Sequence, residues 1–167
     1  MARSHERAVM EARRETPFQR ADRNFQELLA ELRVLQTVVQ ILFGFMLILA
    51  IQPRFAAASG FTHVTYLIAL VLCCTATALL MAPVAYHRTL FARGLKPEVV
   101  RVSDRLARGG MVALFLAIVA SVLLVFDLAV NRFVAVVLTV CVATVFVLLW
   151  YVMPLRRLRQ LQLADDQ

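Results

Sequence analysis

The chain has little of what soluble enzymes and secreted domains rely on. Charged residues make up only 17% of its 167 residues, and it holds three cysteines and three histidines. All three cysteines fall inside long apolar runs without CxxC spacing, so neither a disulfide framework nor a cysteine metal site is indicated. No phosphate-loop, dinucleotide-binding or zinc-protease motif occurs. We therefore predict no enzyme activity, no cofactor and no metal site.

Hydrophobic residues, in contrast, make up 61% of the chain, whereas soluble domains average about half. Four apolar runs approach or exceed the ~20 residues that a helix needs to cross a ~30 Å hydrocarbon core. Helices are required because lipid cannot satisfy backbone polar groups. We predict an all-α, polytopic membrane protein whose four transmembrane helices cover residues 34–51, 64–86, 111–130 and 133–153. The predicted domains are a flexible basic tail (1–16), one membrane domain (17–157) and a cytoplasmic tail (158–167).

The basic residues lie almost entirely on one side of the predicted spans. The net charge is +7, and all but two of the 18 Lys and Arg residues, Arg54 and Arg132, belong to the two terminal segments and the middle loop. Because an excess of Lys and Arg marks the cytoplasmic side, both termini are predicted to be cytoplasmic. The clusters contain no interleaved stacking aromatics, which argues against a nucleic-acid partner. Anionic inner-leaflet lipid is the predicted partner of this charge.

Helices 1 and 3 are predicted to extend beyond the membrane into the cytoplasm. Thr16, Pro17 and Gln19 form a helix start with a capping box. A helix from Pro17 to Ile51 is about 50 Å long, which exceeds the hydrocarbon thickness by about 20 Å. The projecting part stands up from the membrane or lies in the headgroup plane. A similar extension, with Pro97 in its first turn, precedes the third span.

These two extensions carry charges of opposite sign. Glu27 and Glu31 are one turn apart on the first extension, and Arg101, Arg105 and Arg108 share one face of the other. They are candidates for ion pairs in a small cytoplasmic helical bundle. The alternative is that both stripes are solvated faces.

A polar seam leads into the first span. Arg33, Gln36, Thr37, Gln40 and Gly44 fall within about a third of the helix circumference. Lipid cannot satisfy such groups, so the seam is expected to face protein or water. One interpretation is hydrogen bonding between helices, with close approach at the glycine. The other is a water-filled pathway lined by one seam from each subunit of a homo-oligomer.

Asp127 is the only acidic residue within a predicted span, and it falls near the outer end of that span. A carboxylate at this depth needs a partner or water. Arg132, Arg54 and His63 are the candidates on the outer side. Asp127 is therefore interpreted either as half of an ion pair that fixes the outer loops or as an ion-binding group at an outer mouth.

Three segments carry a resemblance to a known family. "RETPFQRADRNFQELLAELRVLQTVVQILF", "APVAYHR" and "SDRLA" resemble small actinobacterial integral membrane proteins of a family of unknown function, over roughly residues 14–130. The resemblance implies a location in a bacterial plasma membrane. It transfers no catalytic residues.

Together the seam and the four spans favour a small homo-oligomeric ion channel or ion-permeable pore. Helix 1 would line its cytoplasmic entrance, because the seam begins at the inner end of that span. The alternative function is a non-conducting scaffold or accessory subunit of a larger membrane complex. The predicted partners are further copies of the chain and membrane lipid.

Overall fold

The computed structural model describes residues 17–90 and 96–165, and within these ranges the chain is helical and contains no strand. The all-α prediction with four transmembrane helices is confirmed, since four helices are long and apolar enough to cross a membrane. The predicted tail at residues 1–16 lies outside the described residues. In chain order the elements are α2 (Pro17–Ala50), α3 (Pro53–Ala56), α4 (Gly60–Leu90), α5 (Lys96–Ala129), α6 (Arg132–Val147), the π-helical turn η2 (Leu148–Val152) and α7 (Met153–Asp165).

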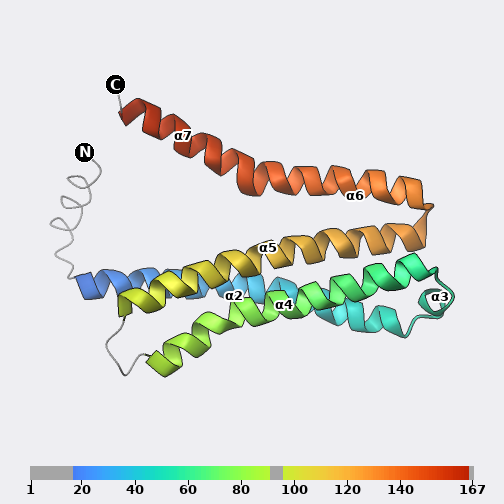
Figure 1. The fold of residues 1–167 in the computed structure, drawn as a ribbon, viewed down its shortest axis with the longest axis horizontal. Helices are drawn as coiled ribbons and strands as arrows, with labels where there is room; N and C mark the ends of the chain where they lie inside the picture. Colours follow the sequence, from blue (N-terminus) through green and yellow to red (C-terminus); the bar gives the residue numbers. More distant parts are fainter. Residues whose placement is uncertain (1–16, 91–95, 166–167) are drawn as a thin grey trace.

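The long helices form an up-and-down bundle in which α2, α4 and α5 lie together and α6 runs beside α5 (Figure 1). α4 and α5 share the most extensive contact, α2 packs against both, and α6 packs chiefly against α5. The start of α2 and the end of α7 lie at one end of the bundle, here called the terminal end. α3 lies at the opposite end, here called the α3 end.

Small side chains allow α4 and α5 to approach closely. On α4, Ala69, Cys73 and Ala76 are fully buried, and Ala117 is fully buried on α5. At Gly110 of α5, an added Cβ would lie 2.7 Å from Cγ of Leu80, a separation that real Cβ atoms essentially never show. Close packing of this kind is the main source of helix association in lipid, where the hydrophobic effect between helices is absent.

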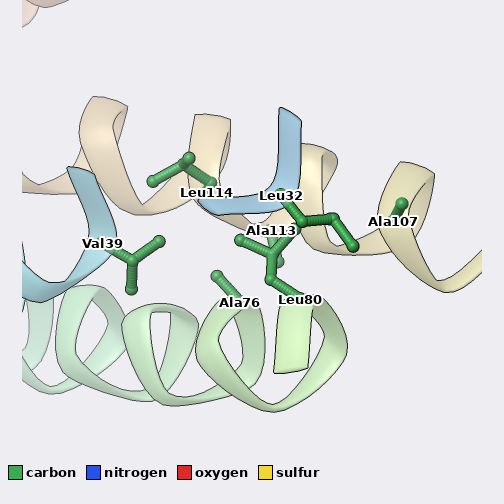
Figure 2. Close-up of a cluster of buried hydrophobic side chains, with 7 residues drawn as sticks. All are labelled: Leu32, Val39, Ala76, Leu80, Ala107, Ala113 and Leu114. Carbon is green, nitrogen blue, oxygen red and sulfur yellow. The ribbon is translucent and has the colours of Figure 1, made fainter. Parts of the chain in front are cut away.

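The core side of α2 is a stripe of apolar residues two turns apart. Phe25, Leu32, Val39 and Met46 are all buried, as expected for a helix with one apolar stripe facing its neighbours. Around Leu32 the stripe meets both other helices of the trio, and Figure 2 shows this cluster. Its buried members are Leu32 and Val39 from α2, Ala76 and Leu80 from α4, and Ala107, Ala113 and Leu114 from α5.

α2 and α5 are each single uninterrupted helices of 34 residues. At 1.5 Å per residue each is about 51 Å long, well beyond the ~30 Å of a hydrocarbon core. Because Phe25 on α2 and Ala107 on α5 are buried, the two helices also pack over the polar part of their length. The predicted extension of helices 1 and 3 beyond their apolar stretches is thus present in the fold.

α6 and α7 are held more loosely than the other helices. On α6 only Ala135 and Thr139 are buried, and the leucines of α7 are more than half exposed. Between the two helices the chain widens into the π-helical turn η2. Pro154 explains the wide turn, because it has no N–H to bond the carbonyl of Trp150 in α-helical register. Beyond this turn α7 leans away from α5 (Figure 1).

Candidate functional site

The five residues of the predicted seam lie on one flank of α2, but the structure divides them into two groups. Gln36 is half-buried, and so is Gly44, whereas Arg33, Thr37 and Gln40 are exposed on the surface of the single chain. The exposed members lie within an apolar helix segment that is long enough to cross a membrane. The seam therefore has one member directed at another helix and others open to the surroundings of the chain.

Gln36 makes the contact between helices. Its Nε2 donates a hydrogen bond of 2.9 Å to the backbone carbonyl of Leu80 on α4. Leu80 lies three residues before Pro83, which stands inside α4 and interrupts the backbone hydrogen bonding of that helix because it has no N–H. The amide thus links α2 to α4 close to this proline, which is the helix-to-helix role that one interpretation of the seam predicts.

The remaining seam residues have no such partner on another helix among the residues that the structure describes. The hydroxyl of Thr37 donates to the carbonyl of Arg33 within α2, at 2.9 Å. Gln40 forms no hydrogen bond to another described residue and is exposed. An added Cβ at Gly44 would meet no heavy atom within 4 Å. Any close approach at Gly44 therefore involves something other than the described residues of the same chain.

In the extensions of α2 and α5 beyond their apolar stretches, the charged residues pair within their own helices. Glu27 bonds Arg23 at 3.2 Å, one turn away on α2, and Arg108 bonds Asp104 one turn away on α5. Glu31 and Arg105 are both exposed. Among the described side chains no ion pair joins Glu27 or Glu31 to Arg105 or Arg108, and the side chain of Arg101 lies outside them. The two extensions instead share an apolar cluster that includes Leu32 of α2 and Ala107 of α5.

Asp127 is buried near the C-terminal end of α5, with only 6% of its side chain exposed. One carboxylate oxygen accepts a 2.7 Å hydrogen bond from the hydroxyl of Thr62 on α4. The other accepts from Nε of Arg132, at 3.3 Å, at the start of α6. The carboxylate therefore connects three helices at the α3 end of the bundle.

Ser59 extends this polar network. Its hydroxyl accepts a 2.9 Å hydrogen bond from Arg132 and lies 2.9 Å from the hydroxyl of Thr62. It also accepts the backbone N–H of Thr62 at 3.3 Å, which is the geometry of an N-cap for α4. The guanidinium of Arg132 lies 4.1 Å from the centre of the Phe61 ring, a cation–π distance. We call Asp127, Arg132, Ser59 and Thr62 the outer network.

Of the three candidate partners for Asp127, the structure places Arg132 against it. His63 instead faces the carbonyl of Ser59 through Nδ1, at 3.0 Å, and its ring packs against Phe55. Arg54 lies on α3, beside a groove between α2 and α5. Ser59 and Thr62 were not singled out from the sequence, although S-x-x-T at a helix start is the spacing of an N-cap and its partner.

The described residues contain no group of His, Cys, Asp and Glu side chains that could hold a metal ion. The cysteines are free, with Cys73 buried and Cys74 and Cys141 exposed on the apolar surface. The polar groups therefore act by hydrogen bonding and charge, at two levels of the bundle. One level is the seam on α2, and the other is the outer network.

Four long apolar helices, joined by short connections and carrying few internal polar groups, define a multi-pass membrane protein. Within that class, the chain belongs to a family of unknown function, DUF6328, whose model matches residues 14–154. This agrees with the resemblance to an uncharacterised family that the sequence carries. Neither a curated protein nor a solved structure matches the chain.

Proposed function

We propose that the protein is a homo-oligomeric, ion-permeable pore of the bacterial plasma membrane, with both termini in the cytoplasm. In this proposal the α2 helices of several copies surround the pathway, and their exposed seam residues line its cytoplasmic entrance. The four spans of one copy hold too few inward-facing polar groups to enclose a solute path alone. The pathway therefore requires more than one copy.

The observation that carries this proposal is the exposure of Gln40 on an apolar helix. In a solitary chain its amide would face acyl chains without a hydrogen-bond partner, which is unfavourable. Arg33 and Thr37 are exposed on the same flank, and the open space at Gly44 would admit a neighbouring helix. A second copy or water supplies partners for these groups, whereas hydrocarbon does not.

A second candidate is a non-conducting scaffold or accessory subunit. Gln36 favours it, because its hydrogen bond to Leu80 uses the most buried seam amide for packing rather than for lining a pathway. In that case the exposed seam would face a different membrane protein. Anionic lipid of the inner leaflet is a proposed partner in both cases, because the cytoplasmic segments carry most of the Lys and Arg residues.

The decisive experiment measures both the oligomeric state of the protein and the ion flux through it. The full chain is reconstituted into nanodiscs for subunit counting and into liposomes that hold an ion-sensitive dye. An oligomer that conducts supports the pore. An oligomer or monomer without flux under a range of ions and voltages overturns the pore and leaves the accessory subunit as the function.

Two variants test whether the seam lines the pathway. Replacing Gln40 with Leu is expected to lower flux and to weaken association about fivefold, the equivalent of a ~1 kcal/mol interhelical hydrogen bond. Thr37→Val removes an exposed hydroxyl from the seam, and Thr75→Val removes an exposed hydroxyl from α4 that likewise bonds the carbonyl one turn before it. If the seam lines the entrance, only Thr37→Val should lower the ion flux. An equal loss of flux in both threonine variants, or no loss in either, contradicts a seam-lined entrance.

The proposed orientation has its own test. In a cysteine-free background, a cysteine at Arg54 is expected to react with a membrane-impermeant thiol reagent added outside intact cells. A cysteine at Arg88, at the other end of α4, is expected to react only after the cells are opened. The reverse pattern would place the termini outside.

A further inference from the structure

A groove of about 430 Å³ lies at the α3 end of the bundle, where the last turns of α2 and α5 meet α3. Its walls are mostly apolar and include Leu49 from α2 and Val125 and Leu128 from α5. Arg54 also lines it, together with Gln52. A cation thus stands beside an apolar groove.

The groove lies where two of the apolar helices end, which is where lipid headgroups are expected. α2 ends at Ala50 and α5 ends at Ala129, and the outer network of Asp127 and Arg132 occupies the same end of the bundle. Leu49 and Val125 belong to the apolar helices just before these ends. A ligand in the groove therefore has headgroups on one side and hydrocarbon on the other.

Arg54 lacks a carboxylate partner. It forms no ion pair within the described residues, and it is exposed. The other arginine at this end, Arg132, is bonded to Asp127. The sequence contains no Asp or Glu between Glu31 and Glu98, and Asp127 is the only acidic residue of the last two spans and their connection. Further copies of the chain therefore bring no free carboxylate to this end.

We propose that the groove binds an anionic phospholipid, with its phosphate on Arg54 and an acyl chain along Leu49, Val125 and Leu128. This ligand supplies the missing anion and the missing apolar contact in one molecule. A single negative headgroup matches the single unpaired cation, and phosphatidylglycerol is the probe with that charge. The site lies within one chain, so it is independent of whether the protein assembles or conducts ions.

Native mass spectrometry of the full chain tests the site. The protein is extracted from nanodiscs that contain equal amounts of phosphatidylglycerol and phosphatidylcholine, and the retained lipids are counted per chain. Phosphatidylglycerol is expected to be retained about fivefold in preference, which is the effect of one cation near a membrane surface. Arg54→Gln is expected to abolish the preference, whereas Arg105→Gln, an exposed arginine at the other end of α5, keeps it.

A second variant blocks the groove and leaves its charge unchanged. Val125→Trp is expected to reduce retention of both lipids, and Val145→Trp serves as its control because Val145 on α6 is similarly exposed, 53% against 50%. Equal retention by the wild type and both groove variants would overturn the proposal. Loss of the bound lipid on addition of inorganic phosphate alone would also overturn it, because the site would then bind a free anion.

Discussion

The α4–α5 pair and the α6 helix have similar hydrophobicity but very different packing. α4 and α5 approach each other closely at Gly110, where Leu80 fills the space that the glycine leaves, and Ala69 and Cys73 of α4 are fully buried. The continuous helical stretch Arg132–Leu163, which α6 begins, has the highest mean hydropathy among the four candidate spans, yet only 11% of its most apolar window is buried in the chain. Hydropathy therefore predicts which segments enter a membrane, and side-chain size decides which of them form the core of the bundle.

The two regions also differ in how polar groups are used. Partway along the bundle, a single amide from Gln36 joins α2 to α4. At the α3 end, Asp127 and Arg132 join α5 to the start of α6, which has few other buried contacts. We infer that the position of α6 depends on this polar connection, whereas the α4–α5 contact depends on the close fit of small and large side chains.

Overpacking the α4–α5 contact gives the largest expected effect. Gly110→Leu should lower the free energy of unfolding by about 3 kcal/mol, because the new side chain would occupy the space of Leu80, which is fully buried. The measurement is unfolding in mixed micelles by titration with a denaturing detergent. Gly44→Leu is the matched control and should change the value little, since nothing lies within 4 Å of its Cβ position.

Removing the carboxylate at the α3 end should come next. Asp127→Ala should cost about 2 kcal/mol, since it deletes hydrogen bonds to a buried charged group from Thr62 and Arg132. Arg132→Gln should cost less, because that side chain is half exposed. Hydrogen exchange should show the loss of protection concentrated in the first turns of α6. Equal loss along α5 and α6 would refute the idea that the outer network serves chiefly to hold α6.

The Gln36 hydrogen bond is expected to be worth less. Gln36→Leu should lower stability by about 0.6 kcal/mol, the average for hydrogen bonds between membrane helices. Gln40→Leu is the matched substitution at the exposed amide of the same helix. Measured on dilute, unassembled chains by the same unfolding titration, Gln40→Leu should have no effect. A larger loss at Gln40 than at Gln36 would mean that the exposed amide has a partner within the chain.

The smallest effect is expected on the open side of α6. Val140 is 58% exposed, and Val140→Leu should change the unfolding free energy by less than about 0.5 kcal/mol. A control at the α4–α5 contact is Ala76→Leu, because Ala76 is fully buried and the larger side chain has no space there. If the two variants had similar unfolding free energies, α6 and the α4–α5 contact would not differ in how tightly they are packed.

The helices were predicted from the sequence, and the core stripe of α2 was open to prediction, because both follow from local patterns. Apolar length gave the four spans, and helical spacing brought Phe25, Leu32 and Val39 to one buried side. The pairing of Glu27 with Arg23 was also open to prediction, since the two residues are one turn apart.

The contacts between helices were not predictable in the same way, because they depend on how one helix is aligned along another. Nothing near Gln36 in the sequence points to the carbonyl of Leu80, 44 positions away. Among the glycines, position 44 drew attention because it continues the polar seam, yet the close approach within the chain occurs at Gly110. Asp127 was recognised as needing a partner. Its hydrogen bond from the hydroxyl of Thr62 was not predictable, because only the packing of α4 against α5 brings the two residues together.

The π-helical turn between α6 and α7 alters the angular phase of everything that follows it. Arg157 lies eighteen residues, or about five whole turns, after Thr139, so an uninterrupted α-helix would aim it in the same direction as that buried threonine. The wide turn takes up about one extra residue. As a result Leu158, and not Arg157, lies on the same side of the helix as Thr139. Five residues of unusual winding thus decide whether a cation or a leucine continues the α5-facing line of α6 into the last helix.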